Sequence, residues 1–182
     1  MSPPVAPARV AVPRLGQVVF SASGIAGRVR QLAEQIDVDY AGQRLIVAAV
    51  LKGGAVFAAD LVRQLARPAE LDFVALSRYG DAEGGKVELV RDLQADVRDC
   101  HVLVVEDLVD TGFTLHYVVQ QLGRRQPASI RICALLDRPA LRLARIPVGY
   151  IGFDIGDEFV VGYGLDYRER FRELPDITVL EF

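Results

Sequence analysis

The sequence predicts an open α/β fold, in which a mainly parallel sheet carries helices on both faces. Uninterrupted runs of branched aliphatic residues, such as 45–51 and 101–105, alternate with segments whose apolar residues recur at helical spacing. Strands that are apolar on both sides need cover on both sides, and a parallel sheet between layers of helices provides it. No internal repeat and no Gly/Ser-rich linker divides the 182 residues. We therefore expect one domain over residues 17–182.

The composition is typical of a globular protein of the cytoplasm. Hydrophobic residues make up 51% of the chain and its formal net charge is −3, a balance that is not typical of a nucleic-acid-binding protein. The longest apolar runs are too short to cross a membrane. Cys100 and Cys133 lack the spacing of a zinc site and are expected to be buried free thiols. Four prolines among the first fifteen residues predict a disordered extension over 1–16.

The first elements are predicted as follows. A helix begins at Ser21 or Ser23 on a hydroxyl cap. A strand over 45–51, a glycine turn and a second helix, with an apolar face from Val56 to Leu65, come next. Two strands, at 71–77 and 86–90, follow around a mobile loop at 78–85. After them come a strand at 101–105, a helix from 115 to 123 and a strand at 130–136. Short strands at 150–154, 159–163 and 177–180 form a small hood over the sheet.

The most informative segment follows the strand at 101–105. Glu106 and Asp107 come directly after it, and Asp110-Thr111-Gly112-Phe113-Thr114 opens the next helix. Open α/β sheets bind ligands at the carboxyl ends of their strands, and a helix N-terminus with hydroxyls and a glycine suits a phosphate. Acids beside an anion site would repel the ligand unless they meet sugar hydroxyls or a divalent cation. A ribose phosphate satisfies both conditions, whereas a simple helix cap explains single residues but not the whole segment.

This segment, Glu-Asp-x-x-Asp-Thr-Gly-x-Thr-Leu, resembles the phosphoribosyl-pyrophosphate motif of the type I phosphoribosyltransferases, and more narrowly of the hypoxanthine-guanine phosphoribosyltransferases. The resemblance runs from about Ser23 to the C-terminus. The other segments that share that family's order and spacing are 50–54, 79–80, 135–137, 152–155 and 159–167. It implies the type I fold and transfer of the 5-phosphoribosyl group from phosphoribosyl pyrophosphate to a 6-oxopurine, hypoxanthine or guanine. The products would be IMP or GMP and pyrophosphate. It also implies Mg²⁺ as cofactor and a homodimer or homotetramer.

The resemblance also implies roles for individual residues. Asp110 would hold or accept the proton at purine N7, Tyr79 would belong to a loop that closes over the site, and Arg142 would lie near pyrophosphate. Glu106 and Asp107 would contact the ribose hydroxyls and, with Asp166, the metal ion. The remaining substrate-binding residues would be Lys52, Gly53 and Arg172 at pyrophosphate, Thr111, Gly112, Phe113 and Thr114 at the 5′-phosphate, and Arg138, Phe159 and Val160 at the purine.

Three residues depart from the family pattern. Arg138 stands where the family most often has a lysine that donates to the purine 6-oxo group, so the choice among hypoxanthine, guanine and xanthine is open. Arg78 replaces a serine, and Glu158 replaces a lysine. The alternatives to the leading hypothesis are a transferase that prefers xanthine or another base, and an RNA-binding transcriptional regulator with this fold. The acidic balance and the complete purine-site segment favour the enzyme.

Overall fold

The computed structural model describes residues 13–79 and 86–182, and its largest element is a six-stranded sheet. The strand order is β4-β3-β2-β5-β6-β7. Neighbouring strands are parallel except for β4, which pairs antiparallel with β3. The strands are β2 (Leu45–Leu51), β3 (Glu70–Tyr79), β4 (Lys86–Arg91), β5 (His101–Val109), β6 (Ser129–Asp137) and β7 (Tyr150–Asp154). The predicted mainly parallel α/β sheet is confirmed.

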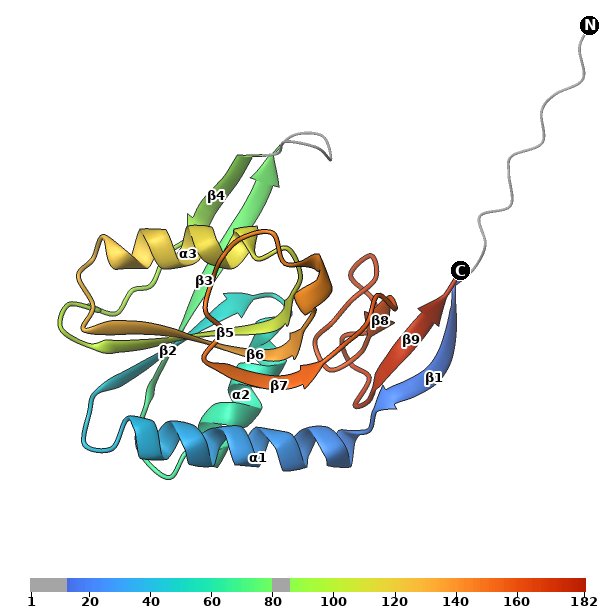
Figure 1. Ribbon diagram of the computed structural model, residues 1–182, viewed down its shortest axis with the longest axis horizontal. Helices are drawn as coiled ribbons and strands as arrows, with labels where there is room; N and C mark the ends of the chain where they lie inside the picture. Colours follow the sequence, from blue (N-terminus) through green and yellow to red (C-terminus); the bar gives the residue numbers. More distant parts are fainter. Residues whose placement is uncertain (1–12, 80–85) are drawn as a thin grey trace, which may run out of the picture.

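Helices cover both faces of this sheet, with α1 (Ala22–Asp39) and α2 (Gly54–Gln64) on one side and α3 (Phe113–Gly123) on the other (Figure 1). Of the two hydroxyls expected to cap α1, Ser21 does so, because its Oγ accepts from the Gly24 amide at 3.2 Å. No helix within the described ranges is long and apolar enough to cross a membrane.

Alternate residues of the central strands enter two separate cores. Leu45, Val47 and Ala49 of β2 pack with α1 and α2. Their neighbours Ile46 and Ala48 pack in the second core with α3. Since both faces are buried, the strand reads as one aliphatic run. The two cysteines are free and buried, as predicted.

The face of α2 differs from the prediction. Val56 is 37% exposed, whereas Phe57 and Ala58 are fully buried and pack against the sheet. The helix is short and rich in apolar residues on several sides, so spacing alone did not define which side faces the core.

A second, antiparallel sheet of three strands forms a hood beside the first, in the order β1-β9-β8. We use "hood" for residues 14–20 and 155–182. Its strands are β1 (Arg14–Phe20), β8 (Val160–Val161) and β9 (Ile177–Glu181). The boundary predicted for the N-terminal extension is wrong, because Arg14 and Leu15 already pair with β9. Residues 1–12 of that extension lie outside the described residues.

Two other predicted boundaries also change. The strand expected at 159–163 has two residues, because the chain turns at Gly162 and Gly164, whose φ angles are 102° and 98°. Arg78 and Tyr79 belong to β3 rather than to a loop. The rest of the expected mobile loop, residues 80–85, lies outside the described residues.

Candidate active site

A pocket of about 320 Å³ lies where β2 and β5 end and where the hood meets the sheet. Parallel strands present their carboxyl ends at one edge, so segments that are far apart in sequence meet there. Ten of the predicted site residues line the pocket: Lys52, Gly53, Glu106, Asp107, Asp110, Thr111, Gly112, Thr114, Asp166 and Arg172.

The turn after β2 packs unusually closely against its neighbours. A Cβ atom on Gly53 would lie 1.6 Å from Asp107 Oδ2, and one on Gly164 would lie 2.4 Å from the carbonyl oxygen of Gly53. The Leu51–Lys52 peptide bond is cis. Glycine is therefore required at 53 and 164 so that the ends of β2, β5 and the hood can converge.

The segment after β5 forms a tight loop at the start of α3. Gly112 has a φ of 81°, and its carbonyl accepts from the His116 amide at 2.9 Å. The Thr111 carbonyl accepts from the amides of Leu143 and Ala144, at 3.0 and 2.9 Å. These bonds hold the loop in place at the N-terminus of α3, where the helix dipole favours a negative charge. The loop can therefore bind an anion at the pocket.

Glu106 and Asp107 lie side by side on the pocket floor. Burial, followed by the negative charge of Asp107, raises the pKa of Glu106 well above its ordinary value. Burial also raises the pKa of Asp107, although its carboxylate accepts from the Leu108 amide at 2.8 Å. The Asp107 amide donates to Glu106 Oε1 at 3.3 Å, and hydroxyl groups or a cation in the pocket would interact favourably with the remaining carboxylate oxygens.

The opposite rim of the pocket carries two cations that share an acid. Glu169 Oε2 lies 2.9 Å from Lys52 Nζ and 3.5 Å from an Arg172 nitrogen. Arg172 also contacts Asp166 Oδ1 at 2.8 Å, and the Glu169 amide donates to the other oxygen of Asp166. The Lys52 ammonium lowers the pKa of Glu169. The sequence carries no signal for Glu169, because only a turn with positive φ at Arg168 and Glu169 brings it to Lys52.

Asp110 stands at the edge of the pocket with its side chain 45% exposed. Its Oδ1 accepts from Arg138 at 2.8 Å. Arg142 does not line the pocket: it pairs with Asp137 and donates to the Asp110 carbonyl at 3.2 Å. The pyrophosphate contact that the resemblance implies for Arg142 stays a prediction.

Of the other residues expected at the substrate, Phe113, Phe159 and Val160 lie outside the pocket lining. Phe159 is 45% exposed in the hood, with its ring edge-on to Tyr167 and Phe182 at centroid distances of 5.8 and 5.7 Å. Val160 is buried in β8, and Phe113 is 54% exposed at the start of α3. Tyr79 is the last residue of β3.

A metal site formed by protein side chains alone is not found within residues 13–79 and 86–182, where no three His, Cys, Asp or Glu side chains gather suitably. Mg²⁺ is usually held by one or two carboxylates together with substrate oxygens and water. Glu106, Asp107 and Asp166 fit that requirement, because all three line the same pocket and offer hard oxygen ligands.

Comparison with known proteins agrees with this geometry. The model of the phosphoribosyl transferase domain family matches residues 19–168. A hypoxanthine-guanine phosphoribosyltransferase from Mycobacterium tuberculosis is 42% identical over 90% of this chain and 85% of its own length. A hypoxanthine phosphoribosyltransferase from Haemophilus influenzae is 43% identical over 90% of this chain and 96% of its own. A crystal structure of a hypoxanthine-guanine phosphoribosyltransferase from Bacillus anthracis superimposes with a TM-score of 0.89 at 37% identity, covering 94% of this chain and all of that one. The chain belongs to the phosphoribosyl transferase domain family.

Proposed function

We propose that the protein transfers the 5-phosphoribosyl group from phosphoribosyl pyrophosphate to hypoxanthine and guanine, as a cytoplasmic enzyme of purine salvage. A purine ring nitrogen forms the new bond to C1′ while the bond from C1′ to the pyrophosphate oxygen breaks, and the base loses a proton. The observation that carries the proposal is the convergence of the loop at the N-terminus of α3, a buried acid pair and two basic side chains on one pocket. The names of the relatives from M. tuberculosis and H. influenzae support the choice of base.

Each side of the pocket suits one part of the substrate. The loop of Thr111, Gly112 and Thr114 would bind the 5′-phosphate, because it combines helix N-terminal amides with hydroxyls. Glu106 and Asp107 would accept hydrogen bonds from the ribose hydroxyls, which lie one sugar ring away from that phosphate. The cations of the rim would then face the pyrophosphate at C1′.

Asp110 is the residue that we assign to the purine proton. It is the first residue of the loop that precedes α3, and the Arg138 guanidinium joins its carboxylate to the carbonyl of Glu158, the residue before Phe159. An aspartate in that position can hold the proton at N7 as the ring nitrogen begins to bond to C1′.

Mg²⁺ fits this pocket as a companion of the substrate. Asp166, with Glu106 and Asp107, would hold it through oxygen ligands, directly or through water. When bound, the ion neutralises charge that develops on the leaving pyrophosphate. Lys52 and Arg172 would act on the same leaving group from the protein side.

A direct test measures nucleotide formation from hypoxanthine, guanine, xanthine and adenine with phosphoribosyl pyrophosphate and Mg²⁺. We expect IMP and GMP to form, with pyrophosphate released in equal amount. Preferential use of xanthine or adenine would contradict the assigned base. Binding of labelled RNA without any nucleotide formation would favour the regulator instead. Light scattering on the same preparation tests the expected dimer or tetramer.

A further inference from the structure

Arg138 differs from the other arginines around the pocket because all three of its nitrogen atoms donate to groups of the protein. It follows the last residue of β6 and is buried. Nε donates to the Gly156 carbonyl at 2.6 Å, one terminal nitrogen to Asp110 Oδ1 at 2.8 Å, and the other to the Glu158 carbonyl at 2.8 Å. One side chain thus joins the end of β6, the loop after β5 and the hood.

The shape of the guanidinium makes this arrangement possible. Its nitrogen atoms lie in one plane and point in three directions, so they reach acceptors on separate segments at the same time. A lysine carries all its donors on a single atom and cannot take the place of all three nitrogens. The bonds are short and charge-assisted, and they replace water around a buried cation.

The acceptors are next to the residues that would contact the purine. Glu158 precedes Phe159, and Asp110 is the proposed proton acceptor. We propose that Arg138 is a positioning residue, which clamps hood residues 156–158 to Asp110 and so holds the purine site together, instead of reading the 6-oxo group of the base. The proposal rests on the function proposed above, but the clamp itself can be tested without any substrate.

The first experiment measures amide hydrogen exchange in the ligand-free protein. In Arg138→Lys we expect amides of residues 155–160 to exchange about ten-fold faster than in the wild type, since charge-assisted bonds to that segment are lost. Unchanged exchange in this segment would overturn the clamp.

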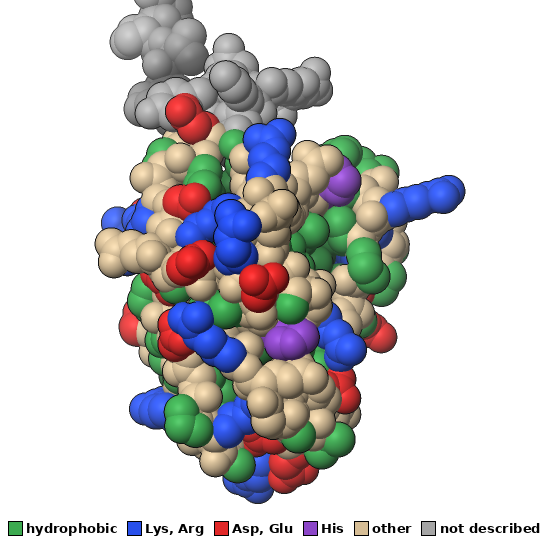
Figure 2. Space-filling model, turned by 90° about the vertical axis from the view of Figure 1, so that its left-hand side faces the viewer, with side chains coloured by type: hydrophobic (Ala, Val, Ile, Leu, Met, Phe, Trp, Pro, Cys, Tyr) green, Lys and Arg blue, Asp and Glu red, His purple; other side chains and the backbone are tan. Residues whose placement is uncertain are grey.

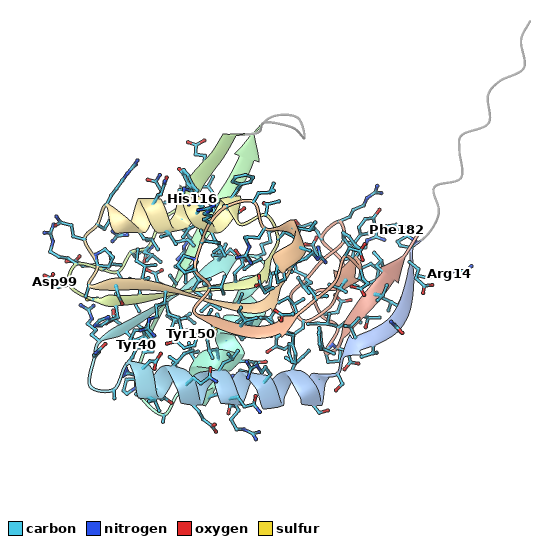
Figure 3. The ribbon with its side chains drawn as sticks, viewed as in Figure 1. Arg14, Tyr40, Asp99, His116, Tyr150 and Phe182 are labelled. Carbon is cyan, nitrogen blue, oxygen red and sulfur yellow. The ribbon has the colours of Figure 1, made fainter. Side chains whose placement is uncertain are left out.

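The matched control is Arg131→Lys, the same substitution near the other end of β6. Arg131 donates to Asp39 and to the Tyr150 hydroxyl, at 2.6 and 3.0 Å, and packs over Tyr40. Figure 3 shows Tyr40 and Tyr150 at the end of the molecule opposite Phe182 of the hood. We expect Arg131→Lys to leave exchange at 155–160 unchanged. Faster exchange in both variants would indicate general destabilisation and would overturn the clamp.

The second experiment separates positioning from reading of the base. Calorimetry gives the dissociation constants of IMP and of purine riboside 5′-monophosphate, which has hydrogen at C6 in place of oxygen. We expect Arg138→Lys to weaken both nucleotides by a similar factor, on the order of ten-fold. A loss confined to IMP would show that Arg138 reads the 6-oxo group and would overturn the proposal.

The two experiments also separate this proposal from the proposed function. If the wild-type protein bound neither nucleotide, the proposed function would fail, and hydrogen exchange alone would decide whether Arg138 is a clamp. Strong wild-type binding with equal losses in Arg138→Lys would support both.

Discussion

The pocket contains buried carboxyl groups and basic side chains, and one substrate could interact favourably with both. Burial raises the pKa of Glu106 and Asp107, while the exposed Lys52 and the half-buried Arg172 share the carboxylate of Glu169. A ribose with phosphate groups at both ends offers hydroxyls to the carboxyl groups and negative charge to the basic side chains. This complementarity leads to two predictions about single residues.

Asp110→Asn should lower kcat at least about 100-fold, because an amide cannot accept the purine proton and general-base catalysis contributes factors of this size. The KM for phosphoribosyl pyrophosphate should change little. Steady-state kinetics with hypoxanthine measure both constants. Asp92→Asn is a suitable control, since it removes a half-exposed carboxylate that pairs with Arg125 outside the pocket. An unchanged kcat in Asp110→Asn would remove this residue from the mechanism.

Glu169→Gln should strengthen inhibition by pyrophosphate about two- to five-fold, because it removes an anion that shares Lys52 and Arg172 with that product. The effect is modest because Lys52 and Glu169 are largely exposed. Product-inhibition kinetics give the constant. Glu173→Gln removes the same charge from the same loop and should have little effect. Weaker pyrophosphate binding in Glu169→Gln would instead mean that this carboxylate holds Lys52 in position.

At the scale of the elements, the pocket depends on how closely the turn after β2 approaches the end of β5 and the hood. Gly53 lies against Asp107, and the carbonyl of Gly53 lies against Gly164 of the hood. The spacing of these segments therefore depends on the absence of two side chains. Gly54 adds to this, since its Cβ would lie 2.9 Å from the carbonyl oxygen of Val105.

Gly53→Ala should lower the free energy of unfolding by about 1–3 kcal/mol and abolish most activity, because the added methyl group would overlap the Asp107 carboxylate and displace it from its place in the pocket. Urea denaturation measures the first effect. Gly27→Ala is the matched control: it lies in α1 with open space around its Cβ, and should raise stability by about 0.5–1 kcal/mol. Equal stability of Gly53→Ala and the wild type would contradict the close packing of this turn.

At the scale of the whole molecule, the pocket lies between the main sheet and the hood, and the end opposite the hood has a different distribution of charged side chains. Glu106 and Asp107 come from the main sheet, while Asp166 and Arg172 come from the hood, so the pocket needs both. The end opposite the hood, shown in Figure 2, has basic and acidic side chains interspersed. Ion pairs at that end include Arg44–Glu70 and Arg131–Asp39, both at 2.6 Å. No field of a single sign suited to nucleic acid is seen on that face.

The buried acids should make global stability depend on pH. Folding raises the pKa of Glu106 above its ordinary value of 4.5, so the folded ligand-free protein binds this proton more tightly than the unfolded chain does. The contribution of this group to the free energy of unfolding is complete below pH 4.5, and it is lost as the pH rises through the pKa of the folded state. Glu106→Gln should therefore flatten the decline of unfolding free energy above pH 4.5, measured by urea denaturation at several pH values. An equal slope in both proteins would contradict the raised pKa.

The parts of the fold that could be read from the sequence are those fixed by local pattern. β2, β5 and β6 read as aliphatic runs because both their faces are buried, and α1 shows its cap and its apolar face. β1 was assigned in part to a disordered extension, since its first residues gain order only by pairing with β9 from the far end of the chain. Pairing between distant segments leaves no local periodicity to detect.

The same division applies to the site. The sequence by itself determined the family, and it predicted that residues 106–107 and 110–114 contribute to one site, because they lie close together in the chain and their chemistry does not depend on distant segments. Only the tertiary structure decided which groups Arg138, Arg142 and Glu169 contact. Long charged side chains can reach many partners, and the partner they take is set by which segments the two sheets bring within a few ångströms.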